Sequence, residues 1–599
     1  NFRHDSEIGV TISPYKGLSY ALRIPGAEKL YGRWNAVSRI DVVSGASTRV
    51  MPGLSYTFTG NPPDQLGMAL DADSLQPITL IDPEDFTAAN YLPESIAFRL
   101  KPESNVMVLE SGGGLGVMQA LAGGANQVAA VVNNKLLVDS ISETASEQDV
   151  YSLPKVQTHI ESSRVALRSS NEKFDVVYLP LSDPYRPVAS GAYSLSENYS
   201  LTVESISDML TKLSPDGLLV VTRWIQTPPS ESLRLFATLI EGLERLGIEA
   251  SESKIVAYRG IQTMTFLVKL EGWEDEQLTQ IRNFLDERRF DLVWSPDINP
   301  AEVNRHNRLA EPEYFHQFRE LISAESRQDF YSDYSSSIRP ARDNHPFFFH
   351  FFKWQQTPEI LATFGRVWQP FGGSGYFVLI ALLILVVLLS SLLIIFPLII
   401  RSRRSKSFPK IDAVDYRKGN KVSPWRVFTY FGSIGIAFLF LEIPLIQISI
   451  LSMEHPIYAF TLVVLTILMF SGLGSYLAPR FWNFRRLILL TLFGLAIIIP
   501  LGLGLIQEQT LGWPLIPRIL VIAISLAPLG LLMGFPFPFG LTWLEKARSR
   551  LVPWAWAVNG CASVIAAVLA AILALSSSFS IVLIIGAIFY GIAGLVMKV

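Results

Sequence analysis

A series of long apolar stretches constrains the C-terminal part of this sequence more than any other feature. Seven stretches from Tyr376 onward are each long enough to cross a hydrocarbon core of about 30 Å. Every backbone polar group inside a bilayer must be bonded within the protein, so these stretches predict an all-α polytopic bundle in the cell membrane. The expected spans are 376–400, 427–451, 457–478, 486–506, 516–540, 555–576 and 579–597.

Lys and Arg residues are distributed unequally among the connectors between these spans. Sixteen lie in the first, third and fifth connectors and at the C-terminal end, whereas the other three connectors carry one, Arg518. Cytoplasmic loops carry the excess of Lys and Arg, so we expect a cytoplasmic C-terminus and an extracytoplasmic domain before the first span. The sixteen residues are Arg401, Arg403, Arg404, Lys406, Lys410, Arg417, Lys418, Lys421, Arg426, Arg480, Arg485, Arg486, Lys546, Arg548, Arg550 and Lys598.

The stretch Val106–Lys135 organises the part of the chain that precedes the membrane. Its order is a short apolar run, a glycine-rich turn, a helix-forming run and a second apolar run, which predicts a strand–turn–helix–strand unit of a Rossmann-like sheet. Gly112, Gly113, Gly114 and Gly116 form the turn. Glycines there allow backbone to approach a nucleotide and leave helix N-terminal amides free to bind it.

Several motifs around this stretch occur in the order and at the spacing of one known family. They are RWNAVSRIDVV (Arg33–Val43), FDVVYLPLSDP (Phe174–Pro184), YSLSENYSLTVE (Tyr193–Glu204), LSPDGLLVVTRW (Leu213–Trp224), RPARDNHPFFFHFF (Arg339–Phe352), FLFLEIPLIQ (Phe438–Gln447) and APLGLLMGFPFPFG (Ala527–Gly540). The sequence resembles the spermidine synthases, the polyamine aminopropyltransferases built on the S-adenosylmethionine-dependent methyltransferase fold. It is most similar to their large membrane-attached bacterial members.

The resemblance implies a fold class and a set of domains. We expect an α/β Rossmann-like methyltransferase-type domain with a small N-terminal β-domain, followed by an all-α polytopic membrane bundle. The expected boundaries are a β-rich domain at 1–90, the Rossmann-like core at 91–270, a helical or mixed subdomain at 271–344, an aromatic membrane-surface linker at 345–375 and a transmembrane domain of about seven helices at 376–599.

Three carboxylates that the family's chemistry uses are replaced in this sequence. Leu115 stands where the family has the glycine-loop aspartate, Val132 where an acidic residue binds the ribose, and Pro180 where an aspartate helps to deprotonate the amine. A polyamine site needs carboxylates to hold a cation and to accept a proton, which leucine, valine and proline cannot do. The sequence therefore predicts that aminopropyl transfer has been lost.

The remaining polar residues give site hypotheses that depend on whether the domain is active. Gly112, Gly113, Gly114 and Gly116, with Asn133 in place of the ribose contact, would form a vestigial nucleotide loop. Asp183, the second aspartate of the family's D-x-x-D-P motif, is the candidate for a catalytic role, and Asp183 and Glu197 would hold an amine. We expect no bound cofactor, or decarboxylated S-adenosylmethionine if the domain is active.

Polar residues within the predicted spans are the third group of interest. Glu442 and Gln447 lie in the second span and Asn559 lies in the sixth. The functional interpretation is a proton or substrate pathway, and the simpler one is a neutral carboxyl bonded to a neighbouring helix through Asn559. His345 and His350 lie among phenylalanines without acidic or cysteine neighbours to complete a metal site, so we expect no metal.

Composition limits the other possibilities. The formal net charge of −3 gives no reason to expect nucleic acid, and the single cysteine, Cys561, excludes a disulfide within the chain. The first residue is Asn1, so we expect a processed or partial chain. The leading hypothesis is a binding or scaffold module, which includes a place as a subunit of a larger membrane complex. The alternatives are an active membrane-bound aminopropyltransferase and a transporter with a soluble sensing domain.

Overall fold

The computed structural model describes residues 11–45, 50–181, 193–358, 362, 374–397, 399–400, 423–546 and 551–597. They form two compact units. The α/β unit contains residues up to 181 and the described parts of 198–341 and 351–362, whereas the helical unit contains 193–197, 342–350 and the described residues from 374 onward. The helical unit therefore includes two short segments that lie far from its helices in the sequence.

The α/β unit begins with a small antiparallel sheet in the order β1-β2-β3-β4. Its strands are β1 (Glu28–Trp34), β2 (Arg39–Ser44), β3 (Gln65–Leu70) and β4 (Asp73–Thr79). Asp71 and Ala72 both have positive φ between β3 and β4, as a tight hairpin turn requires. Residues 54–60, although rich in aromatic and β-branched side chains, form no strand, because the Ser55 hydroxyl accepts a hydrogen bond from the Thr57 amide and stabilises a local turn.

The larger sheet has the order β12-β10-β11-β9-β8-β5-β6-β7. Strands β9, β8, β5, β6 and β7 are parallel, and β11, β10 and β12 add an antiparallel edge. The strands are β5 (Asn105–Val108), β6 (Gln127–Val132), β7 (Val156–Ile160), β8 (Phe174–Leu179), β9 (Leu213–Trp224), β10 (Ile255–Arg259), β11 (Thr263–Lys269) and β12 (Asp291–Trp294). The mixed sheet confirms the Rossmann-like prediction.

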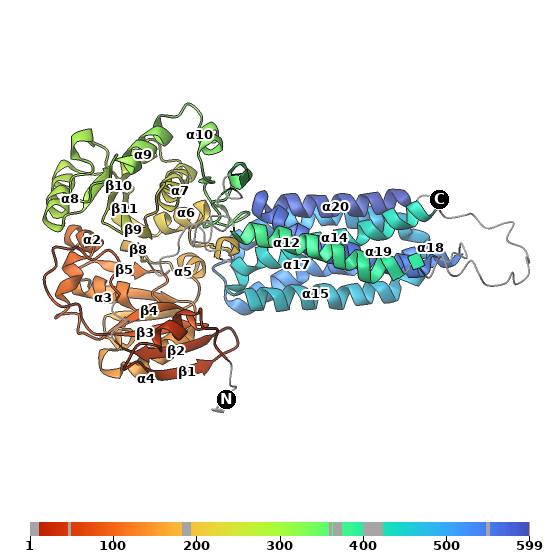
Figure 1. Ribbon diagram of the computed structural model, residues 1–599, viewed down its shortest axis with the longest axis horizontal. Helices are drawn as coiled ribbons and strands as arrows, with labels where there is room; N and C mark the ends of the chain where they lie inside the picture. Colours follow the sequence, from red (N-terminus) through yellow and green to blue (C-terminus); the bar gives the residue numbers. More distant parts are fainter. Residues whose placement is uncertain are drawn as a thin grey trace, which may run out of the picture. The chain divides into compact units, whose positions relative to one another are not determined.

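Helices connect these strands and cover the sheet (Figure 1). The helices that pack on the sheet do so through an apolar face. The helices are α1 (Gly17–Ala21), α2 (Ser95–Leu100), α3 (Leu115–Ala122), α4 (Lys135–Thr144), α5 (Ser163–Ser169), α6 (Val203–Thr211), α7 (Glu231–Arg245), α8 (Asp275–Arg288), α9 (Glu313–Ser323) and α10 (Arg327–Asp333).

One hydrophobic core joins the small sheet to the larger one. Ile40 and Met68 of the small sheet belong to the same buried cluster as Val106, Val108 and Val128 of the parallel strands. Residue Ile78 of β4 also forms an isolated backbone bridge with Gly114 of the glycine turn. The small sheet is therefore an integral part of the α/β unit and lies against the turn that follows β5.

The helical unit has six described helical runs that are long and apolar enough to cross a membrane. The seven predicted spans fall on these six runs because the third and fourth lie in one continuous run, Pro456–Thr510. The helices are α12 (Ser374–Ser390), α14 (Pro424–Met453), α15 (Pro456–Leu477), α16 (Arg485–Thr510), α17 (Leu515–Met533), α18 (Pro536–Lys546), α19 (Val552–Ser576) and α20 (Phe579–Val596). This unit is that of a multi-pass membrane protein.

Contacts between the helices fix their directions. Arg426 at the start of α14 donates to the Val596 carbonyl at the end of α20, so these two helices are antiparallel. Gln507 near the end of α16 donates to Ile448 near the end of α14, so α14 and α16 are parallel. Consequently Arg426, Arg485 and Arg486 lie at one end of the bundle, which we call the basic end, and α14 ends at the opposite end.

The segment 342–350 packs at the end opposite the basic end. Asn344 accepts the Ser580 amide through its side chain (3.1 Å), and His345 Nε2 lies 3.0 Å from the Leu575 carbonyl oxygen. Phe347, beside them, is 2% exposed and contacts Phe579 edge-on. These aromatic and polar side chains therefore pack inside the protein, in a segment expected to lie on the membrane surface.

Candidate functional site

A cleft of about 260 Å³ opens in the α/β unit beside the glycine turn. It lies between the carboxyl ends of the neighbouring strands β5 and β8. From β5 the chain continues to β6 and β7 on one side of the sheet, and then returns to β8 and β9 on the other side, so the strand order reverses between β5 and β8. Ligands of open α/β sheets bind at such a switch point, outside the carboxyl ends of the strands. The cleft is lined by Val50, Pro52, Leu75, Gln76, Pro77, Leu92, Glu94, Glu110, Ser111, Gly112, Gly113, Leu115, Gly116, Gln119, Tyr178, Pro180, Leu181 and Trp224.

The glycine turn is shaped by close contacts with its own unit. Gly112 and Gly114 have φ of +49° and +88°, a left-handed conformation that favours glycine. A Cβ on Gly113 would lie 2.2 Å from the carbonyl oxygen of Pro77 in β4. Gly113 is therefore required by the approach of the small sheet, and the β4 backbone occupies part of the turn's surface.

The cleft presents apolar groups at two of the positions where the family has carboxylates. Leu115 and Pro180 both line it. Val132 ends β6 and is 1% exposed. No carboxylate at these three positions is available to a ligand.

The amides that follow β6 do not line the cleft. Asn133, the predicted ribose contact, is exposed and is absent from the cleft wall. Asn134 instead accepts the Leu136 amide as the N-cap of α4 and donates to the Ser38 hydroxyl at 2.7 Å. Asn35 donates to the same Asn134 side chain at 2.8 Å, so Asn134 ties the small sheet to α4.

Glu94 is a cleft-lining carboxyl whose role the sequence analysis did not recognise. It is 4% exposed and accepts a hydrogen bond from Gln119 Nε2 at 3.0 Å, while Gln119 Oε1 accepts from the Tyr178 hydroxyl at 3.1 Å. Burial raises the pKa of Glu94, and hydrogen bonds from Thr222 and Gln119 oppose that rise. The available signal was a lone glutamate within the apolar stretch 91–98.

Glu110 is the second carboxyl in the cleft wall. It directly follows Leu109 at the end of the first parallel strand and has φ of +48°, which is strained for a residue other than glycine. Its carboxylate accepts a hydrogen bond from the Ser200 hydroxyl. Because the described residues of the cleft wall include two carboxyls and no Lys or Arg, they favour a neutral or cationic ligand over a phosphate.

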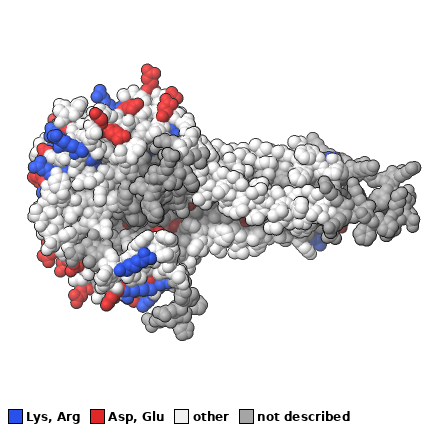
Figure 2. Space-filling model, viewed as in Figure 1, with Lys and Arg blue, Asp and Glu red and all other residues white. Residues whose placement is uncertain are grey.

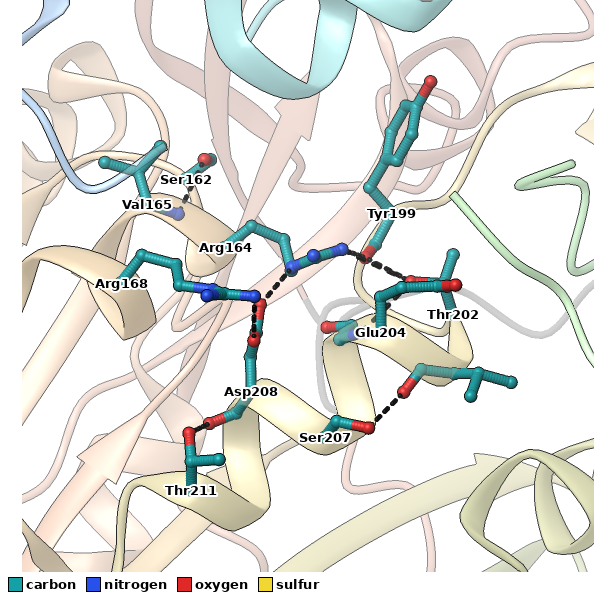
Figure 3. A network of polar contacts seen from close by, with 12 residues as sticks. Ser162, Arg164, Val165, Arg168, Tyr199, Thr202, Glu204, Ser207, Asp208 and Thr211 are labelled. Carbon is teal, nitrogen blue, oxygen red and sulfur yellow. Dashed lines mark hydrogen bonds and ion pairs between the residues drawn. The ribbon is translucent and has the colours of Figure 1, made fainter. Parts of the chain in front are cut away.

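A buried ion-pair network holds the turn that carries Ser200 (Figure 3). Arg164 is 4% exposed and donates to Asp208 through Nε at 3.0 Å. Its Nη1 donates to the Tyr199 carbonyl and the Thr202 hydroxyl, both at 3.3 Å. Arg168 pairs with the other Asp208 oxygen at 2.7 Å. The network fixes the start of α6, where Thr202 is the N-cap.

The other predicted site residues do not share this cleft. Asp183 lies outside the described residues. Glu197 belongs to the helical unit, where it accepts a hydrogen bond from Gln447 of α14 at 2.8 Å. Burial raises the pKa of Glu197, and the bond from Gln447 opposes that rise. No group of three or more His, Cys, Asp or Glu suited to a metal occurs among the described residues.

Charged side chains lie mainly on the α/β unit, and the visible face of the helical unit is built mostly of other residues (Figure 2).

Asn559 of α19 donates to the Phe431 carbonyl of α14 at 3.2 Å. It therefore stabilises the α14–α19 contact and is not the partner of Glu442.

Several solved structures are similar to this chain. A spermidine synthase in complex with the transition-state analogue AdoDATO is 13% identical, with a TM-score of 0.29 over 47% of this chain and 85% of that one. Spermidine synthase from Thermotoga maritima is 13% identical, with a TM-score of 0.28 over 48% of this chain and 84% of that one. A probable spermidine synthase from Corynebacterium glutamicum ATCC 13032 is 14% identical, with a TM-score of 0.30 over 44% of this chain and 88% of that one. No protein-family profile and no curated protein sequence matches the chain.

Proposed function

We propose that this protein is a multi-pass membrane protein whose α/β unit is a ligand-binding or scaffold module that does not transfer aminopropyl groups. The observation that supports this most directly is the pair of apolar side chains, Leu115 and Pro180, in the cleft wall. They stand where the resembled family has an aspartate that contacts the donor and an aspartate that helps to deprotonate the amine. An amine that binds here would lack both groups.

An activity assay tests this proposal. The full-length protein, purified in detergent, is incubated with decarboxylated S-adenosylmethionine and putrescine, and spermidine is quantified by mass spectrometry. We expect no spermidine above a reaction without protein, while a soluble spermidine synthase in the same detergent serves as the positive control. Spermidine formed with repeated turnover would refute the proposal.

A second candidate function, active aminopropyl transfer, is favoured by one observation. Glu94 and Glu110 supply two carboxyls to the cleft at positions other than the three that are replaced. If they serve catalysis, the wild-type protein forms spermidine, and Glu94→Gln and Glu110→Gln each reduce its formation. The same assay therefore separates the two candidates.

We also propose that the α/β unit is extracytoplasmic. Arg426, Arg485, Arg486 and Lys546 all belong to helix ends at the basic end of the bundle, which favours a cytoplasmic position for that end. The segment 342–350, which leads into the helices, packs at the other end. S-adenosylmethionine-type donors are cytoplasmic metabolites, so this orientation agrees with a module that does not use them.

A further inference from the structure

A short 3₁₀ helix, η11 (Ala478–Phe484), connects α15 to α16 at the basic end of the bundle. Residues three positions apart share a face of such a helix, so Phe481 and Phe484 lie on one face, and Trp482 and the next residue of that row, Arg485, lie on another. Phe481 is 41% exposed and Phe484 is 57% exposed. Exposed Phe side chains beside basic residues are typical of a segment that lies among lipid headgroups.

The indole of Trp482 contacts two cations that come from different helices. Arg485 Cζ lies 4.7 Å from the ring centroid and Lys546 Nζ of α18 lies 4.1 Å from it, so the two charges are at most about 9 Å apart. The Arg485 guanidinium also donates to the Trp482 carbonyl at 3.3 Å. The indole itself packs edge-on against Phe539 of α18. The packing of one ring therefore brings the two cations together.

Neither cation has a counter-ion among the described residues. The polar contacts of Arg485 and Lys546 are those with Trp482, and the carboxylate of Glu545, beside Lys546, forms no ion pair with a described residue. By contrast, Arg518 in the same helical unit pairs with Glu454 at 2.6 Å. Two neighbouring positive charges repel each other, and an anion that contacts both of them relieves this repulsion.

We propose that Arg485 and Lys546 form a binding site for the headgroup of an anionic phospholipid. The lipid phosphate accepts hydrogen bonds from the guanidinium and the ammonium groups, and the acyl chains contact the exposed face formed by Phe481 and Phe484. A lipid is favoured over an acidic protein because this apolar face adjoins the cations in a segment that joins two membrane helices. The site is separate from the cleft of the α/β unit, and it does not depend on which side of the membrane the basic end faces.

Native mass spectrometry of the full-length protein in detergent tests the site. The protein is titrated with phosphatidylglycerol or with phosphatidylcholine of the same acyl chains, and the fraction that carries one lipid is measured at each concentration. We expect phosphatidylglycerol to bind at least about tenfold more tightly, because the choline group of the other lipid compensates its phosphate. Equal affinity for the two lipids would overturn the proposal, and this comparison needs no variant.

An excess of inorganic phosphate distinguishes the lipid from its phosphate alone. We expect phosphatidylglycerol to remain bound, because its acyl chains contribute contacts that a free phosphate lacks. Displacement by inorganic phosphate would overturn the assignment of the site to a lipid.

Variants separate a defined site from the general positive charge of the basic end. Arg485→Gln and Lys546→Gln each remove one cation from the ring of Trp482 and should weaken phosphatidylglycerol binding about fivefold. Lys546→Arg retains the charge and should bind as the wild type does. Arg480→Gln is the matched control, because Arg480 lies on a different face of η11, with its guanidinium 5.6 Å from the ring centroid of Tyr476, and should leave the affinity close to wild type. Equal losses in Arg480→Gln and Lys546→Gln would show that charge alone attracts the lipid, and would overturn the proposal.

Discussion

Glu94 shows how one buried carboxyl can make the stability of the α/β unit depend on pH. Burial raises its pKa, so the folded unit retains a proton that the unfolded chain releases. The stabilisation is complete below the usual carboxyl pKa and is lost as the pH rises through the raised value. We expect wild-type stability to fall by up to about 1.4 kcal/mol per pH unit in that interval. Glu94→Gln, which keeps a bond to Gln119 without a titrating group, should remove this fall.

Hydrogen exchange measures this effect within the intact protein. Exchange rates of β5 and β8 amides, corrected for the intrinsic effect of pH, report the opening free energy of the unit. The wild type and Glu94→Gln should diverge as the pH rises, with the wild type becoming less protected. Parallel profiles across the whole range would contradict the assigned role of Glu94.

Asp208 gives a second prediction for a single side chain. It faces the guanidinium groups of Arg164 and Arg168, and Arg164 is almost fully buried. Asp208→Asn removes the charge that compensates both groups, so the free energy of unfolding should fall by about 3 kcal/mol. Amide exchange in α5 and α6 provides the measurement.

The pair Arg245–Glu204 is the matched control on the same helix α6. Its two atoms lie 3.6 Å apart and the Arg245 side chain is 39% exposed. Water screens such a pair, so Glu204→Gln should lower the free energy of unfolding by no more than about 1 kcal/mol. Equal losses in the two variants would show that burial does not determine the strength of the network.

Among the helices, α20 begins with a cap supplied from a distant segment. Its own N-cap residue, Ser578, makes no side-chain cap bond, whereas Asn344 Oδ1 accepts from the Ser580 amide at 3.1 Å and from the Ser580 hydroxyl at 2.9 Å. Asn344→Ala should therefore destabilise the first turn of α20 by about 1 kcal/mol. Faster exchange of the amides at 580–582 would report this loss. Asn344→Asp retains the acceptor and should leave exchange there close to wild type, so equally rapid exchange in both variants would argue against capping.

The membrane orientation of the whole protein leads to a prediction about access. In a Cys561→Ala background, we expect cysteine at Glu249, an exposed position in the α/β unit, to react with an impermeant maleimide in intact cells. A cysteine at Ser405, in the first connector, should react only after the cells are opened. The prediction follows from the excess of Lys and Arg in that connector. The reverse labelling pattern would place the α/β unit in the cytoplasm.

Patterns among neighbouring residues were sufficient to predict the membrane helices, the core of the parallel sheet and the class of fold. An apolar run of twenty residues in a bilayer can only be a helix, and the alternation of apolar strands with a glycine turn predicts the core of the parallel sheet. Gly112, Gly113 and Gly116 line the cleft for the same local reason, because a turn after a buried parallel strand lies at the carboxyl edge of the sheet.

Tertiary contacts alone determined which side chains line the cleft and which distant segments belong to the helical unit. Glu94 at the N-cap of α2, Gln119 of α3 and Tyr178 of β8 meet only after the sheet has formed. The contact of Gly113 with Pro77 depends on how the small sheet docks. Likewise, Glu197 lies 250 residues from its partner Gln447. The periodicity of apolar residues indicates which face of a helix or strand is buried. The residues that contact this face come from distant parts of the chain, so no local sequence pattern predicts them.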